Sequence, residues 1–161
     1  MQFTTTAIIA LASALLTAAA PTGTESLVPR ACSTAYPQAI GFPINYKISQ
    51  DANGANKQDA YISFSNIPAG SYGCTLRVDF PAGYTINQSG ASQVNFISVD
   101  GAAPGSIFGT TTFSSPQIAV INSATCSNVM TYKMTIASQS QAGSIAFADV
   151  QNAGITMTYN C

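Results

Sequence analysis

The sequence has no histidine, no tryptophan and few charged residues. Charged side chains make up 7% of its 161 residues and hydrophobic ones 47%, and the formal net charge is −1. The absence of histidine removes the usual general base of serine and cysteine hydrolases, together with His-ligated zinc and copper sites. Because the chain also lacks a basic cluster, we expect it to bind neither nucleic acid nor an anionic membrane surface.

Carboxylates are scarce as well. The only glutamate is Glu25, and the aspartates are Asp51, Asp59, Asp79, Asp100 and Asp149. Paired aspartates can run a glycosidase or an aspartic protease, but nothing in this spacing marks a cleft. Asp79 follows two residues after Arg77, which predicts a surface charge pair. With no histidine and no free thiol, we expect stability to change little between about pH 5 and about pH 8.5. No nucleotide-binding motif is present, so no cofactor is expected.

The longest apolar run is too short for a typical membrane-spanning helix. It covers residues 7–20 and ends in three alanines, whereas a spanning helix needs about 20 residues. Such a run is typical of a signal peptide, so we expect residues 1–20 to be removed and the rest to be secreted, without a membrane segment. Residues 21–30 then form either a short pro-segment cut after Arg30 or a disordered arm that is never cut. Residues 31–161 are expected to form a single domain.

Four cysteines follow the proposed cleavage site at Arg30: Cys32, Cys74, Cys126 and Cys161. No two of them form a C-x-x-C pair, which argues against a zinc site or a redox pair, so we predict two disulfides. Three pairings are possible. We favour Cys32–Cys161 with Cys74–Cys126, because the first bond would tie the two ends of the mature domain together. Cys74 and Cys161 share the parity of the apolar residues around them, which predicts that both point inward.

The hydrophobic pattern after residue 30 has a period of two, typical of strands with one buried face. It predicts about eight strands: 44–48, 60–65, 72–80, 94–99, 118–121, 130–136, 145–150 and 155–161. The parity changes between Phe96 and Ile97, which predicts either a bulge or a strand that is buried on both faces. Turn sequences such as Asn53-Gly54 separate the strands, and no segment has a helical period. We therefore predict an all-β fold, an antiparallel β-sandwich of about eight strands with two disulfides.

Three tyrosines and one sequon are the candidate binding features. Tyr36, Tyr61 and Tyr84 lie at outward or loop positions, where an aromatic ring can stack on a sugar; the alternative is that they are ordinary surface tyrosines. Asn87 begins an N-glycosylation sequon in a predicted loop, and we expect the site to be occupied in a secreted chain. Four other tyrosines have inward parity and are expected in the core: Tyr46, Tyr72, Tyr132 and Tyr159.

Three blocks of the chain resemble a family of extracellular fungal domains. They are FSNIP at 64–68, CTLRVDFP at 74–81 and the ending GITMTYNC at 154–161. They are similar to the β-domain family named after the C-terminal part of a yeast ubiquitin-pathway-binding protein (the BUT-two type). That resemblance implies a secreted or wall-associated fungal β-sandwich and assigns no catalytic residue. A second similarity, to four-cysteine β-barrel allergens of the Alternaria type, rests on the first five residues, the size and the cysteine count.

Three hypotheses for the function follow. The first is a non-enzymatic extracellular fungal protein, associated with the cell wall or released toward a host, whose partner is a wall polysaccharide or a host protein. The second is a carbohydrate-binding module that uses Tyr36, Tyr61 and Tyr84. The third is a hydrolase that uses a pair of aspartates. None of the three requires a metal or a cofactor.

Overall fold

The computed structural model of the chain describes residues 31–38 and 41–161, so the predicted signal peptide, the segment 21–30 and its cleavage site at Arg30 lie outside the described residues. The elements in chain order are β1 (Ser33–Ala35), β2 (Ile44–Gln50), the 3-10 turn η1 (Ala52–Gly54), β3 (Ala60–Phe64), β4 (Cys74–Phe80), β5 (Ile86–Gly90), β6 (Gln93–Ser98), β7 (Ile107–Thr112), β8 (Gln117–Ala124), β9 (Met130–Ile136), β10 (Gly143–Asp149) and β11 (Gly154–Tyr159). Among these residues, no helix has the length and apolar character to cross a membrane.

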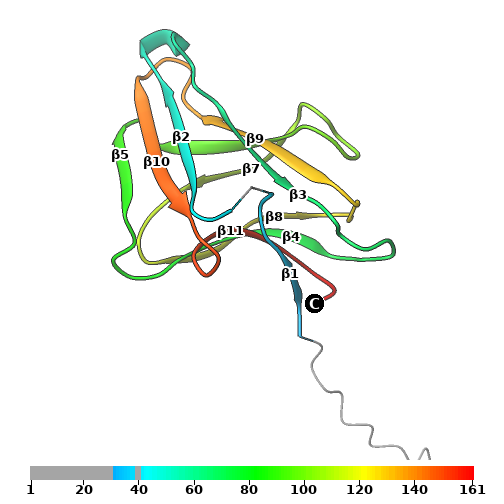
Figure 1. Cartoon of the computed structure of the whole chain (residues 1–161). Helices are drawn as coiled ribbons and strands as arrows, with labels where there is room; N and C mark the ends of the chain where they lie inside the picture. The colour runs from blue at the N-terminus through cyan, green and yellow to red at the C-terminus, as the bar shows by residue number, and fades with distance from the viewer. Residues whose placement is uncertain (1–30, 39–40) are drawn as a thin grey trace, which may run out of the picture.

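The strands form three antiparallel sheets. Sheet A has the order β1-β11-β4-β8, sheet B has β2-β10-β5, and sheet C has β3-β9-β6-β7. In Figure 1, sheet B stands at one end of the molecule, and its strands cross the direction of the strands in the other two sheets. The predicted antiparallel β-sandwich is confirmed, with sheet B as an additional layer that closes one end.

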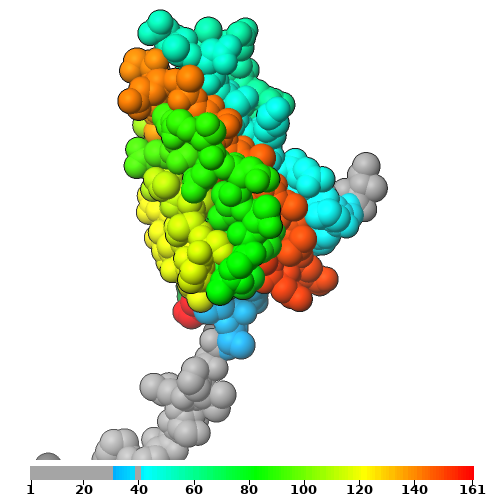
Figure 2. Space-filling view, turned by 90° about the vertical axis from the view of Figure 1, so that its left-hand side faces the viewer, coloured from blue at the N-terminus to red at the C-terminus, as the bar shows by residue number. Residues whose placement is uncertain are grey.

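All eight predicted strands are present, and three further strands, β1, β5 and β7, were not predicted. Each of the three lies at the edge of its sheet. In Figure 2 the green segment that includes β5 lies open on the surface of the molecule. An edge strand buries few side chains, so it need not show the alternating hydrophobic pattern of an inner strand.

An aromatic cluster joins the three sheets. Phe80 of sheet A lies 5.5 Å from Phe147 of sheet B, measured between ring centroids. Phe113, in the connection between β7 and β8, lies 5.5 Å from Phe80 and 5.1 Å from Phe147, and it also contacts Phe96 of sheet C at 6.3 Å. Each such pair contributes about 0.5–1.5 kcal/mol beyond the burial of its area. The cluster therefore fixes the sheets relative to one another.

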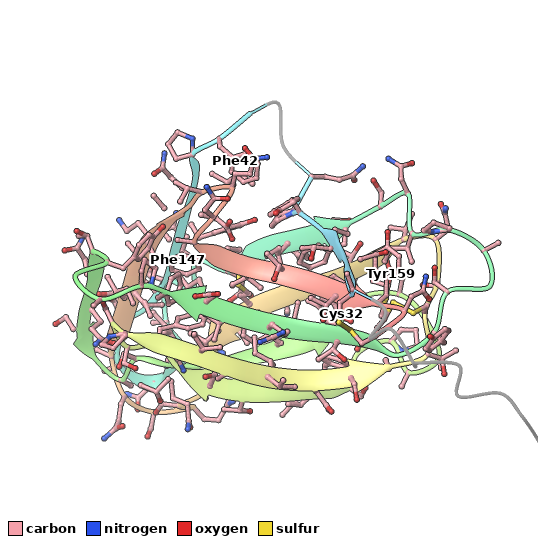
Figure 3. All side chains as sticks on the ribbon, turned by 90° about the horizontal axis from the view of Figure 1, so that it is seen from below. Cys32, Phe42, Phe147 and Tyr159 are labelled. Atoms are coloured by element: carbon pink, nitrogen blue, oxygen red, sulfur yellow. A yellow bond between two sulfur atoms is a disulfide. The ribbon has the colours of Figure 1, made fainter. Side chains whose placement is uncertain are left out.

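Both favoured disulfides are confirmed, Cys32–Cys161 and Cys74–Cys126. Cys74 is buried as predicted, but the prediction that Cys161 points inward is wrong, because that residue is exposed. The reason is that β11 ends at Tyr159 and the next residue, Asn160, has a positive φ of 58°, so the strand parity does not continue. Figure 3 shows Cys32 beside the end of the chain, near Tyr159.

Two further predictions about parity have different outcomes. The register between β6 and β7 shifts between Phe96 and Ile97, so the bulge is the predicted alternative that is present. Its additional residue is Phe108 of β7, and β6 keeps a continuous register with β9. The placement of Tyr72 in the core is wrong, because its side chain is 51% exposed. Gly73 has a φ of +64°, which breaks the alternation between Tyr72 and Cys74, the first paired residue of β4. The other tyrosines of inward parity follow the prediction more closely: Tyr46 and Tyr132 are buried and Tyr159 is half-buried.

Asp149 is a fully buried carboxyl group at the end of β10, with an exposed fraction of 0%. Its Oδ2 accepts a hydrogen bond from the backbone N–H of Ile155 at 2.8 Å, whereas its Oδ1 has no hydrogen-bond partner among the described residues. A Cβ at Gly154 would lie 2.3 Å from this Oδ1, which requires glycine there. Asp149 therefore fastens the turn between β10 and β11.

The burial of Asp149 overturns the expectation of a pH-independent stability. Burial raises the pKa of Asp149 from 3.8 to about 7, although the hydrogen bond from Ile155 lowers it in part. A carboxyl group whose pKa is higher in the folded state holds its proton more tightly there than in the unfolded chain. Stability is therefore greatest below the unfolded pKa and is lost as the pH rises through the folded value.

We expect the free energy of unfolding to fall by up to about 4 kcal/mol between about pH 4 and about pH 7, and then to level off. Asp149→Asn removes the titrating proton and keeps an oxygen for the N–H of Ile155, so it should flatten the curve. Urea unfolding of the wild type and of Asp149→Asn across this pH range measures the two curves. Asp51→Asn, at an exposed carboxylate, is the control and should keep the slope. A flat wild-type curve, or a slope that survives in Asp149→Asn, would contradict the assignment.

Candidate functional site

The outer face of sheet A carries a hollow of about 270 Å³, which we name the outer hollow. Figure 3 looks onto this sheet, with β1, β11, β4 and β8 crossing the view. The lining residues come from β1 and the residue after it, β4, the β10–β11 turn and β11: Thr34, Tyr36, Arg77, Asp79, Gln151, Asn152, Ala153, Gly154, Thr156 and Thr158. The alternation of β4 produces this face, since Leu76, Val78 and Phe80 are buried and the residues between them point outward.

Arg77 and Asp79 share the outer hollow without neutralising each other. Within the described residues the only ion pair is Lys133–Asp59, at 3.6 Å. The predicted surface charge pair between Arg77 and Asp79 is therefore wrong. Neither side chain forms a hydrogen bond to another described residue, so a guanidinium donor and a carboxylate acceptor are both free to bind a ligand.

An aromatic pair borders the outer hollow next to β1. The ring of Tyr36, which is 39% exposed, lines the hollow. It meets the ring of Phe42, which is 41% exposed, edge to face at a centroid distance of 6.2 Å. The sequence analysis did not select Phe42. Phe42 lies in a Gly-Phe-Pro segment outside any predicted strand, and this position could have indicated that its ring is not part of the core.

The turn that follows β10 supplies the amide side chains of the outer hollow. Val150 and Ala153 exchange backbone hydrogen bonds of 2.8 and 3.0 Å, which close the turn around Gln151 and Asn152. The carboxyl group of Asp149 holds the base of the same turn. Gln151 and Asn152 therefore lie on a short, doubly fastened turn, and a site held on fixed elements loses little free energy to ordering when a ligand binds.

The three tyrosines proposed for sugar stacking do not form one site. Tyr36 lines the outer hollow, whereas Tyr61 is 60% exposed on β3 in sheet C, opposite Lys133. The ring of Tyr84 stacks on Phe80 at 4.9 Å, and its hydroxyl group is buried without a hydrogen-bond partner among the described residues. Tyr84 therefore packs as part of the aromatic cluster, and only Tyr36 has polar neighbours that suit a sugar.

The aspartates are dispersed over the described surface. Asp79, Asp51 and Asp100 each line a different hollow of the described surface, and none of these three hollows has a second aspartate. Asp59 is paired with Lys133, and Asp149 is sealed from solvent. A glycosidase of the two-carboxylate type needs both groups at one sugar ring. In residues 31–38 and 41–161, His, Cys, Asp and Glu also form no group of three that could hold a metal ion.

The sequon residue Asn87 lies on a strand and not in the predicted loop. It belongs to the edge strand β5, pairs with Ala146 of β10, and is exposed. The sequence did not reveal this strand because residues 87–90 are all exposed and polar or glycine. A glycan at Asn87 would cover the free edge of sheet B, where an unprotected strand can pair with another chain.

We expect Asn87 to be glycosylated when the full chain is secreted by a eukaryotic host. Treatment with peptide-N-glycosidase should increase the gel mobility of the wild-type protein, and Asn87→Gln should abolish this shift. Asn45→Gln, at an exposed asparagine on β2 of the same sheet that is not in a sequon, is the control and should retain it. A wild-type protein whose mobility the enzyme does not change would show that the site is unoccupied.

No protein-family model, curated protein or solved structure matches this chain. The resemblance to the BUT-two-type fungal domains and the similarity to the Alternaria-type allergens therefore stay predictions.

Proposed function

We propose that this protein is a secreted, non-enzymatic extracellular protein that binds a neutral polysaccharide of the cell wall through the outer hollow of sheet A. One observation carries the proposal: an exposed aromatic ring, a free guanidinium and a free carboxylate line the same hollow on a sheet face. The resemblance to wall-associated fungal domains supports a fungal origin and an extracellular location.

The chemistry of the outer hollow suits a sugar. Asp79 can accept two hydrogen bonds from neighbouring hydroxyl groups, and Arg77 can donate several from a rigid planar group. The side chains of Thr34 and Thr156 add hydroxyl groups that both donate and accept. The ring of Tyr36 offers an apolar face on which the C–H groups of a pyranose can pack.

The charges favour a neutral glycan over an acidic or a basic one. Arg77 and Asp79 carry opposite charges in one hollow, so a charged sugar would be attracted by one and repelled by the other. Among the residues that the structure describes, the same hollow has one carboxylate, Asp79, and no second acid for hydrolysis beside it. These two points support binding without catalysis.

We expect the mature domain to sediment with at least one of three insoluble materials: chitin, β-glucan or isolated fungal cell walls. Tyr36→Ala and Asp79→Asn should each weaken retention, by about tenfold or more for Asp79→Asn, since it removes a charge-assisted hydrogen bond of about 1.5–3 kcal/mol. Sedimentation at several polysaccharide concentrations gives the affinities.

Tyr61→Ala is the matched control, because it removes a tyrosine of greater exposure from a different sheet. Its retention should equal that of the wild type. If Tyr61→Ala abolishes retention while Tyr36→Ala does not, the outer hollow is the wrong site. If none of the three materials retains the wild-type domain, the proposal fails and a protein partner, such as a host protein, becomes the better hypothesis.

A further inference from the structure

A second and larger concavity, which we name the cleft, lies on a different part of the surface. It measures about 390 Å³ and lies between the β6–β7 connection and the β8–β9 connection. It shares no lining residue with the outer hollow. Its volume falls within the range of about 300–1,000 Å³ that small-molecule sites occupy.

The cleft has an apolar floor made by Phe108, Met130 and Tyr132. The rings of Phe108 and Tyr132 contact each other at a centroid distance of 4.7 Å, with their planes tilted by 39°. Met130 and Tyr132 are buried residues of β9, and Phe108 is half-buried on β7. Such a floor can remove the apolar body of a ligand from water.

Both walls of the cleft are held by direct bonds, so the shape exists before a ligand binds. In the β6–β7 connection, Ser98 accepts a backbone hydrogen bond of 2.7 Å from Gly105 and donates one of 3.0 Å to Ser106. On the other wall, Cys126 is tied to β4 by its disulfide with Cys74. A preformed cavity avoids the ordering cost that a flexible site must meet.

Among the described residues, Asp100 is the only charged one that lines the cleft. Its Oδ1 accepts the backbone N–H of Thr131 at 3.0 Å, and its other oxygen has no hydrogen-bond partner among the described residues. Burial raises the pKa of Tyr132, and the charge of Asp100 raises it further. The interior of the cleft is therefore negative.

We infer that the cleft is a second binding site, for a small organic cation whose apolar body lies on Phe108, Met130 and Tyr132 and whose ammonium group faces Asp100. The carboxylate supplies the opposite charge, and an aromatic face attracts a cation that lies within about 6 Å of the ring. No lysine or arginine in the described part of the chain lines the cleft to attract an anion. The inference does not depend on sugar binding at the outer hollow.

The test uses three ligands that share one ring and differ in charge: benzylammonium, benzyl alcohol and benzoate. Each is titrated at neutral pH into the isotope-labelled mature domain, and the backbone amide signals are followed by NMR. We expect saturable shifts at Asp100, Gly101 and Ser106, with affinity highest for benzylammonium, lower for benzyl alcohol and lowest for benzoate. Equal affinity for benzylammonium and benzoate, or no saturable shift with benzylammonium, would overturn the inference.

Asp100→Asn keeps an acceptor for the N–H of Thr131 and removes the charge. It should lower the affinity for benzylammonium about tenfold and leave that for benzyl alcohol nearly unchanged. Asp51→Asn removes the same charge at an aspartate that lines a different hollow, and it should change neither affinity. Equal losses in the two variants would show that only the net charge matters and would overturn the inference.

A second variant, Ala102→Phe, places a large ring on a residue that lines the cleft and should weaken all three ligands. Ala69→Phe, at an exposed position outside the cleft, is its control and should bind like the wild type. Unchanged binding in Ala102→Phe would place the ligand elsewhere. Sedimentation with polysaccharide is expected to be normal in Asp100→Asn, so failure of this inference and failure of the proposed function are separate results.

Discussion

The packing of Phe80, Phe113 and Phe147 is the constraint on which the rest of the structure depends. Each ring lies within 5.5 Å of the other two, and Phe80 and Phe147 come from different sheets. Phe96 extends the contact to the third sheet through Phe113. Because side chains alternate along a strand, fixing one inward residue on β4, β6 or β10 fixes the direction of every other side chain on that strand. The packing of these few rings therefore decides which side chains of β4, β6 and β10 point into the core and which point outward.

The two concavities follow from this arrangement in different ways. The outer hollow lies on a sheet face. Along β4, the buried residues Leu76, Val78 and Phe80 alternate with Arg77 and Asp79, so the alternation that fills the core also turns the two charged side chains to the outer face. The cleft lies between connections, where β6 loses its regular register with β7 and the chain departs from the sheet. The first offers polar groups beside an aromatic ring, and the second offers an apolar floor beside one carboxylate. Their chemistry therefore suits two different classes of ligand.

Asp149 links stability to the geometry of the outer hollow. Its carboxyl group is buried, lies against Gly154 and accepts the N–H of Ile155, so it holds the turn that carries Gln151 and Asn152. A carboxyl group enclosed in this way favours its protonated form, because ionisation without full solvation is costly. A chain with almost no titratable groups near neutral pH thus gains one from tertiary structure alone. The sequence offers no sign of it, since Asp149 is the last residue of β10, and an exposed aspartate is unremarkable at the end of a strand.

The sequence by itself determined the inner strands and the even set of cysteines, because each leaves a local pattern of parity or spacing that does not depend on distant residues. It marked an irregular position at Phe96 and Ile97, and the pairing with β7 decided that this is a bulge. It did not determine the edge strands β1, β5 and β7, because they bury too few side chains to show an alternating hydrophobic pattern. It also did not determine the exposure of Tyr72 and Cys161, because a neighbouring residue of positive φ interrupts the alternation of the strand. Only the tertiary structure decided that Tyr36, Arg77 and Asp79 share a hollow, that the ring of Tyr84 stacks on Phe80, and that Asp100 lines the same cleft as Phe108 and Tyr132. Those neighbours come from segments far apart in the chain, and the distances between them are set by the packing of the sheets.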